Sequence, residues 1–137
     1  MSEIVIYTDG GARGNPGPAA VGVVILRDGE KILEAKQYLG DNLTNNWAEY
    51  EAVIFALVKA LELLLRDEDI EFRLDSQLVV EQLSGRWKIK EASLKGQAQK
   101  VHDLLTSFGT VTFTYVPREK NKDADRLVNE ALDEVSL

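Results

Sequence analysis

The 137-residue chain has no cysteine, one histidine and only three prolines. Without cysteine it can form neither a disulfide framework nor a thiolate metal site. Its longest apolar run, residues 52–65, is interrupted by Lys59 and Glu62 and is too short to span a bilayer. The N-terminus enters a strand pattern within a few residues and shows no signal peptide. These absences predict a soluble, cytoplasmic protein with a single domain over residues 1–137 and no membrane partner.

A surplus of positive charge is also missing, since the formal net charge is −7. Nucleic-acid-binding domains are usually strongly basic, so the total charge argues against a simple binder of that kind. Lys and Arg nevertheless gather within residues 86–100 and 118–126, where a basic face can hold phosphates. Charge alone favours an ordinary mixed surface over such a face. The single histidine, His102, flanks the apolar stripe of a predicted helix, and we assign it no role.

The stretch around which the chain is organised lies at residues 4–18. Its first residues are β-branched or aromatic and predict a buried strand. The glycines and prolines that follow predict that this strand ends at Asp9. A carboxylate at that point is held rigidly and can reach a ligand, and the glycines let backbone N–H groups approach it. A turn in which Asp9 caps its own backbone fits these residues equally well.

Hydrophobic periodicity predicts three strands, then a helix, a strand, two helices, a strand and a final helix. The strands are expected near residues 4–9, 19–27, 31–39, 70–75 and 111–116, and the helices near 44–65, 76–83, 94–108 and 122–135. Asp28-Gly29 is typical of a hairpin turn, so the first three strands form an antiparallel meander. This order predicts an α/β layer fold with a mixed sheet.

Carboxylates fall where several of these elements begin or end. Asp9 and Asp75 each follow a predicted strand, and Glu49 lies in the first turn of a predicted helix. If the two strands are parallel neighbours, their carboxylates meet at the sheet edge where α/β proteins bind ligands. Glu49 stands over a packed stripe of its helix, although a simple interaction with the helix dipole explains it equally well.

A further carboxylate is expected at the start of the last helix, where periodicity alone does not decide between Asp123 and Asp125. Asp125 stacks over Val128 and Leu132, which mildly favours it as the inward residue. Carboxylates without nearby His or Cys repel one another unless a cation is present, and hard oxygen ligands suit Mg²⁺ or Mn²⁺. Two such ions about 3.5–4 Å apart can activate a water and stabilise the leaving oxygen of a phosphodiester.

Four motifs in this order resemble those of type 1 ribonuclease H over essentially the whole chain. They are Thr8-Asp9-Gly10-Gly11 with Gly14-Asn15-Pro16-Gly17-Pro18, Thr44-Asn45-Asn46 with Glu49, Asp75-Ser76-Gln77, and Asn121 with Asp125 and Leu127. The resemblance implies a ribonuclease H-like fold with a five-stranded mixed sheet flanked by helices. It also implies hydrolysis of the RNA strand of RNA–DNA hybrids, leaving 3′-hydroxyl and 5′-phosphate ends. No obligate protein partner is indicated, and we expect a monomer.

The resemblance also implies roles for individual residues. Asp9 would bridge two Mg²⁺ ions, for which Mn²⁺ can substitute. Asp125 would complete the site of the ion that activates water, and Glu49 and Asp75 would complete the other. By the same resemblance, 2′-hydroxyls and base edges would be contacted by Asn15, Asn45 and Gln77. Thr44 would contact a phosphate of the DNA strand. The RNA would lie along the backbone of Gly11, Ala12 and Arg13. Helix capping by the Asn and Thr side chains is compatible with these roles.

The sequence departs from many members of that family at two points. The segment 85–96 is shorter than their basic, Trp-rich protrusion, and its Trp87 is either a hybrid contact or a buried anchor. The loop before the last helix has no histidine, as in the shorter archaeal-type branch, but contains Arg118. A guanidinium there can hold the scissile or departing phosphate, or it can pair with Glu119 or Asp123 at the surface.

Two other functions fit parts of the pattern. Asp-Gly-Gly loops on the same fold hold nucleotide phosphates in small-molecule phosphotransferases such as sugar kinases, but those chains are much longer and have two domains. A catalytically weak, hybrid-binding module would not need all four carboxylates. The complete acidic set therefore favours a nuclease.

Overall fold

The computed structural model describes residues 2–136 as a mixed sheet between helical layers. The elements are β1 (Ile4–Ala12), β2 (Gly17–Arg27), β3 (Glu30–Leu43), α1 (Asn45–Glu62), β4 (Ile70–Leu74), α2 (Gln77–Leu83), α3 (Ala92–Leu105), β5 (Val111–Tyr115), the 3₁₀ turn η1 (Arg118–Lys120) and α4 (Lys122–Val135). The five strands lie in the order β3-β2-β1-β4-β5. Pairing is antiparallel from β1 to β3 and parallel from β1 through β4 to β5, which confirms the predicted mixed sheet.

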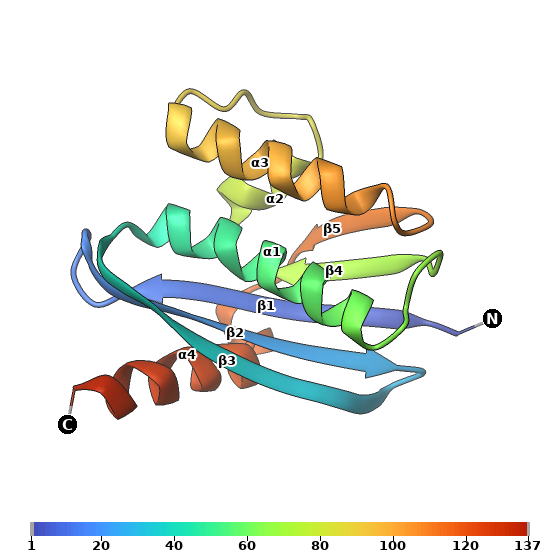
Figure 1. Ribbon diagram of the computed structural model, residues 1–137, viewed down its shortest axis with the longest axis horizontal. Coiled ribbons are helices and arrows are strands. Elements are labelled where there is room, and N and C mark those ends of the chain that lie inside the picture. The colour runs from blue at the N-terminus through green and yellow to red at the C-terminus, as the bar shows by residue number, and fades with distance from the viewer. Residues whose placement is uncertain (1, 137) are drawn as a thin grey trace.

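The helices cover the two faces of the sheet unequally. Helices α1, α2 and α3 lie together on one face, and α4 lies alone on the other (Figure 1). The larger core lies under α1, where Tyr50, Phe72 and Ile6 are fully buried and Phe72 stacks on Phe113 with ring centroids 5.2 Å apart. Small side chains fill the space under α4, among them Ala20 and Ala131. Within residues 2–136, no helix has both the length and the hydropathy needed to cross a membrane.

Strand β1 does not end at Asp9, as the sequence had predicted. It continues to Ala12 because Gly10 and Gly11 keep their antiparallel pairing with β2, opposite Val21 and Ala20. The parallel pairing with β4 is what ends here, at Thr8 and Leu74. Asp9 therefore marks the point at which β1 loses one of its two neighbours, and its side chain lies at the carboxyl edge of the parallel pair.

Local sequence signals explain most of the other boundaries. Asp28 and Gly29 have φ values of 52° and 81°, as a tight hairpin turn between β2 and β3 requires. The Thr44 hydroxyl accepts a hydrogen bond from the backbone N–H of Trp47 (3.2 Å) and so caps α1. Helix α1 ends at Glu62, earlier than predicted, because Leu64 adopts a left-handed conformation with φ 63°.

Candidate active site

Three carboxylates converge at the carboxyl edge of the β1–β4 pair. Asp9 and Asp75 follow the last paired residues of these strands, and Glu49 is the fifth residue of α1, just beyond the first turn in which the sequence had predicted it. One oxygen from each of the three lies within 4.8 Å of the other two. Asp9 and Glu49 are only 7% and 8% exposed. Buried charges of one sign at this spacing require a compensating cation or bound protons.

The position of Glu49 depends on a glycine in β1. The backbone N–H of Gly10 donates a hydrogen bond of 2.9 Å to Glu49 Oε1. A Cβ atom on residue 10 would collide with the backbone of Ala48 and lie 2.7 Å from the backbone nitrogen of Glu49. The start of α1 can therefore approach β1 this closely only because residue 10 has no side chain.

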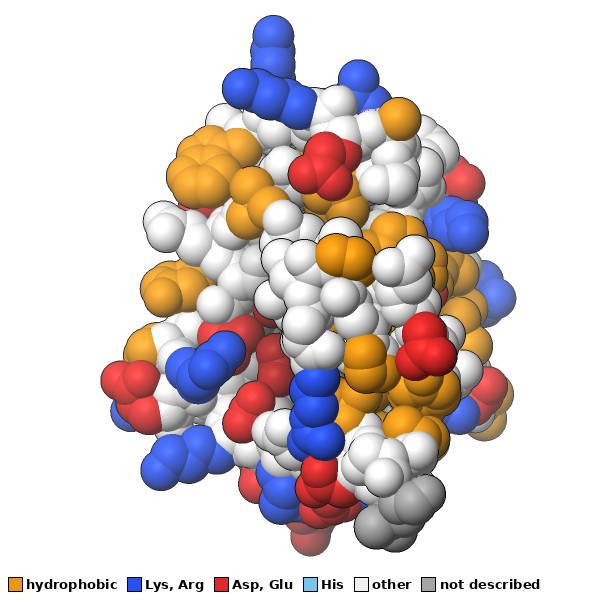
Figure 2. Space-filling view, turned by 90° about the vertical axis from the view of Figure 1, so that its left-hand side faces the viewer, with side chains coloured by type: hydrophobic (Ala, Val, Ile, Leu, Met, Phe, Trp, Pro, Cys, Tyr) orange, Lys and Arg blue, Asp and Glu red, His pale blue; other side chains and the backbone are white. Residues whose placement is uncertain are grey.

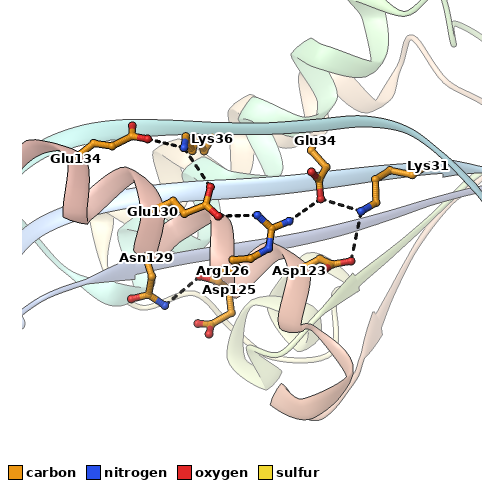
Figure 3. A network of polar contacts seen from close by, with 9 residues as sticks. All are labelled: Lys31, Glu34, Lys36, Asp123, Asp125, Arg126, Asn129, Glu130 and Glu134. Carbon is orange, nitrogen blue, oxygen red and sulfur yellow. Dashed lines mark hydrogen bonds and ion pairs between the residues drawn. The ribbon is translucent and has the colours of Figure 1, made fainter.

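Helix α4 brings Asp125 to the same site from the other face of the sheet. Asp125 lines a cleft of about 510 Å³ together with Asp9, Glu49 and Asp75. Asp123 instead points toward β3, where its carboxylate lies 3.7 Å from Lys31 Nζ (Figure 3). The structure thus separates the two aspartates that periodicity could not, and Asp125 is the one in the cleft. Figure 2 shows acidic side chains in a hollow on this side of the molecule, with basic side chains around its rim.

A second glycine lets α4 approach the sheet. A Cβ atom on Gly22 in β2 would collide with the carbonyl oxygen of Ala124 and lie 2.8 Å from the Cβ of Leu127. The first turns of α4 therefore rest directly on the backbone of β2. This close contact sets how far Asp125 reaches over the edge of the sheet.

Crowding and burial raise the proton affinity of the site. Burial raises the pKa of Asp9 to about 8, with further contributions from the charges of Asp75 and Asp125. Burial, and then the charge of Asp9, raises the pKa of Glu49 well above its usual value, and burial also raises the pKa of Asp75. The positive charge of Arg118 opposes all three shifts. A cation in the cleft would replace the bound protons and favour the charged carboxylates.

Arg118 lies on the rim of this cleft, in the η1 turn. Its side chain is exposed, and within residues 2–136 it forms no ion pair with Glu119 or Asp123. Of the two alternatives left open by the sequence, the surface pair with Glu119 or Asp123 is therefore not formed; the Asp123 carboxylate lies 3.7 Å from Lys31 Nζ instead. The guanidinium faces the acidic cluster and remains available for a further anion.

Asn121 belongs to the fourth motif but had no predicted role, and the structure places it beside the site. It is 1% exposed, and its Nδ2 donates a 2.9 Å hydrogen bond to the carbonyl oxygen of Thr8. Its side chain also lowers the pKa of Asp75. An Asn immediately before a helix resembles an N-cap, yet this side chain makes no capping hydrogen bond. It joins the start of α4 to β1 beside Asp9.

The Asn and Thr residues predicted to contact substrate form hydrogen bonds with the protein's own backbone. Asn45 Oδ1 accepts from the N–H of Ala12 (2.8 Å), and Asn15 Oδ1 accepts from the N–H of Asn45 (3.0 Å). Thr44 caps α1, as expected. Gly11, Ala12 and Arg13 line the cleft next to Asp9, and the Arg13 side chain turns to α4, 2.7 Å from Asp133.

Trp87 and Gln77 lie outside the acidic cleft. Trp87 is 46% exposed, so the expectation of a buried anchor is wrong. It lines a separate groove of about 530 Å³ with Arg86, Lys88 and Lys90. Gln77 is exposed at the start of α2, two residues after Asp75. Both side chains are free to meet a ligand that extends beyond the cleft.

The five-stranded mixed sheet and its acidic edge define a protein of the ribonuclease H-like class. A family model described as "Reverse transcriptase-like" matches residues 7–131. Ribonuclease HI from Halobacterium salinarum is 46% identical over 129 residues, which are 93% of this chain and 63% of that protein. Ribonuclease H from Clostridium botulinum is 32% identical over the full length of both chains. The chain belongs to the type 1 ribonuclease H family.

Solved structures give the same assignment. The crystal structure of LC11-RNase H1 in complex with an RNA/DNA hybrid matches with a TM-score of 0.94 and 45% identity, covering 98% of this chain and 100% of that one. The N-terminal RNase H domain of Rv2228c from Mycobacterium tuberculosis matches with a TM-score of 0.91 and 40% identity, over 99% and 97% of the two chains. The chain spans 63% of the Halobacterium relative and 36% of full-length Rv2228c.

Proposed function

We propose that this protein is an endoribonuclease that hydrolyses the RNA strand of RNA–DNA hybrids, leaving 3′-hydroxyl and 5′-phosphate ends. The observation that carries the proposal is the convergence of Asp9, Glu49, Asp75 and Asp125 on one cleft. The hybrid-bound relative with 45% identity supports the choice of substrate. We expect the chain to act as a monomer in the cytoplasm, as predicted from its sequence.

The donor set fits divalent metal ions, and we propose the four carboxylates as their ligands. All the donors are oxygens, and Asp75 Oδ2 is buried without a hydrogen-bond partner among the described residues. Such hard donors favour two Mg²⁺ ions, with Mn²⁺ as a substitute. When bound, the ions would supply an activated water and stabilise charge on the leaving oxygen. Because the pKa of Asp9 is raised to about 8, a metal ion must displace a proton to bind at neutral pH, and metal affinity should increase as the pH rises.

The chain itself would hold the phosphate and keep the ligands in place. Arg118 can bind a phosphate at the rim through two parallel N–H donors. Gly10 and Asn121 act indirectly, because their hydrogen bonds fix Glu49 and the start of α4. Both are positioning residues.

Recognition of the hybrid would use the residues around the β1–α1 junction. The Oδ1 atoms of Asn15 and Asn45 already accept backbone hydrogen bonds, which leaves their Nδ2 groups as donors. Minor-groove base edges and 2′-hydroxyl oxygens are the matching acceptors. Gln77 would extend this recognition and Thr44 would contact a DNA phosphate, while the backbone of Gly11, Ala12 and Arg13 would follow the RNA. Trp87 would pack against the hybrid beyond the cleft.

Relatives named ribonuclease H match this chain from end to end, which disfavours a small-molecule phosphotransferase. A direct test incubates purified protein with a hybrid labelled on its RNA strand, in Mg²⁺ and in EDTA. We expect internal cuts in the RNA only when Mg²⁺ is present. A matched DNA duplex and the Asp9→Asn variant are the controls. Hybrid binding without cleavage would favour the catalytically weak binding module instead.

A further inference from the structure

A chain of alternating charges joins α4 to the edge strand β3 on the side of the helix away from the cleft. Arg126 is its centre: Nη2 lies 2.7 Å from Glu34 Oε2, and Nη1 lies 2.6 Å from Glu130 Oε2 (Figure 3). Lys31 lies 2.9 Å from the same oxygen of Glu34, and Lys36 extends the chain 3.2 Å from Glu130. The guanidinium thus links a residue of α4 to one on β3, more than ninety positions away in the sequence.

Asp125 precedes Arg126 directly and points the opposite way. Figure 3 shows its carboxylate turned from the ion pairs that surround Arg126. Adjacent residues on a helix lie about 100° apart, so fixing the azimuth of one side chain fixes that of the other. Motion of this turn away from β3 would carry Asp125 out of the cleft that it shares with Asp9.

Several contacts already hold the start of α4: Ala124 lies against Gly22 of β2, Asn121 donates to the carbonyl oxygen of Thr8, and Asp123 lies 3.7 Å from Lys31. Its N-cap residue, Asn121, makes no side-chain capping bond, because that side chain is used to reach Thr8. The amide of Asp125 forms the first helical hydrogen bond, 3.1 Å to the carbonyl oxygen of Asn121. Helix ends without a cap fray readily, so the ion pair of Arg126, one residue after Asp125, adds to these contacts in ordering this end of α4.

We propose that Arg126 is a positioning residue for Asp125, acting through its ion pair with Glu34. The pair fastens α4 to β3 one residue after Asp125 and so helps to hold Asp125 at the cleft. The link between this fastening and metal binding rests on the proposed function. The ion pair is partly exposed, with 45% and 31% of the two side chains accessible, so salt weakens the fastening as well.

Amide hydrogen exchange in EDTA tests the proposal without activity or metal. Arg126→Met removes the guanidinium and keeps the side-chain length, whereas Glu34→Gln breaks the same pair without changing the sequence of α4. We expect the Asp125 amide to exchange about 5-fold faster in both variants. Arg126→Lys should restore most of the protection. Lys59→Met, which breaks an ion pair with Glu62 on α1, should leave it unchanged.

Unchanged exchange at Asp125 in Arg126→Met and Glu34→Gln would overturn the proposal. So would a uniform acceleration that includes the core amides of α1, because that result means a general loss of stability. Mn²⁺ titration by calorimetry then measures whether this contact affects the cleft. We expect the Mn²⁺ affinity to be about 5-fold weaker in both variants. An Asp125→Asn variant that binds Mn²⁺ like the parent would refute the proposed ligand set. The hydrogen-exchange result would then decide by itself whether Arg126 positions Asp125.

Discussion

Replacing Asp9 by asparagine tests the electrostatics of the cleft separately from its chemistry. The substitution keeps the shape of a side chain that is only 7% exposed and removes its charge. It also places an amide donor beside the oxygens of Glu49 and Asp75, which lie within 4.8 Å. In the absence of metal, relief of repulsion should therefore stabilise the folded protein, while cleavage should be lost because an amide cannot replace the ionised carboxylate that we propose as a metal ligand.

The size of the effect follows from the pKa of Asp9, which rises from 3.8 to about 8. The folded protein keeps a proton that the unfolded chain has released, so metal-free stability is fully present below about pH 4 and falls as the pH rises to about 8. At about 1.4 kcal/mol per unit, the whole shift sets a ceiling of about 6 kcal/mol. Because neighbouring carboxylates share the protons, we expect Asp9→Asn to gain about 2 kcal/mol at about pH 8 and almost nothing at about pH 4.

Thermal denaturation followed by circular dichroism measures this difference. In EDTA at about pH 8, a gain of about 2 kcal/mol corresponds to a melting temperature roughly 6 °C higher in Asp9→Asn. Added Mg²⁺ should reduce the difference, since a cation that binds only the folded parent stabilises it selectively. Equal melting temperatures of the two proteins across this pH range would refute the electrostatic argument. Robust cleavage by Asp9→Asn would refute the proposed metal site.

Three further predictions concern packing, phosphate binding and substrate. Gly10→Ala should lower the free energy of unfolding, measured by urea denaturation, by about 2–3 kcal/mol because its methyl group meets the backbone of Ala48. Gly96→Ala is the control: its methyl group meets nothing within 4 Å, so it should not destabilise the protein. Arg118→Ala should lower kcat on a hybrid about 10-fold with metal affinity little changed. Equal, small effects of Arg118→Ala and Lys120→Ala would show that Arg118 is only a surface charge. The protein should cut a hybrid and spare a DNA duplex, and comparable cleavage of the duplex would contradict this. Its affinity for the hybrid, measured by fluorescence anisotropy, should fall steeply with salt, and a salt-independent affinity would contradict that expectation.

Features encoded in short segments could be predicted from the sequence. Thr44 and Ser76 cap helices where expected, and the Asp28-Gly29 turn joins β2 to β3. In each of these cases the signal and its consequence lie within one element or one turn. The parallel pairing of β1 with β4 joins distant segments, and the sequence analysis could state it only as a condition.

Features that depend on distant partners could not be predicted from one sequence. Gly10 reads as a strand breaker, yet pairing with β2 keeps it in β1 and contact with α1 requires it there. Asn121 reads as a helix cap, but its partner is the carbonyl of Thr8, 113 positions earlier. Periodicity favoured Asp125 over Asp123 only mildly, and the family resemblance also pointed to it; the contact that holds Asp123 away from the cleft, with Lys31 of β3, is visible only in the structure.

The cleft takes carboxylates from both faces of the sheet, Glu49 from α1 and Asp125 from α4. Neither helical layer can therefore assemble it alone. During synthesis, Asp9, Glu49 and Asp75 leave the ribosome long before α4, the last element of the described chain. A nascent chain that has folded as far as β5 still lacks its fourth carboxylate, so nuclease activity should begin only when α4 has docked. During refolding, the recovery of activity therefore follows whichever of the two helical layers packs onto the sheet later.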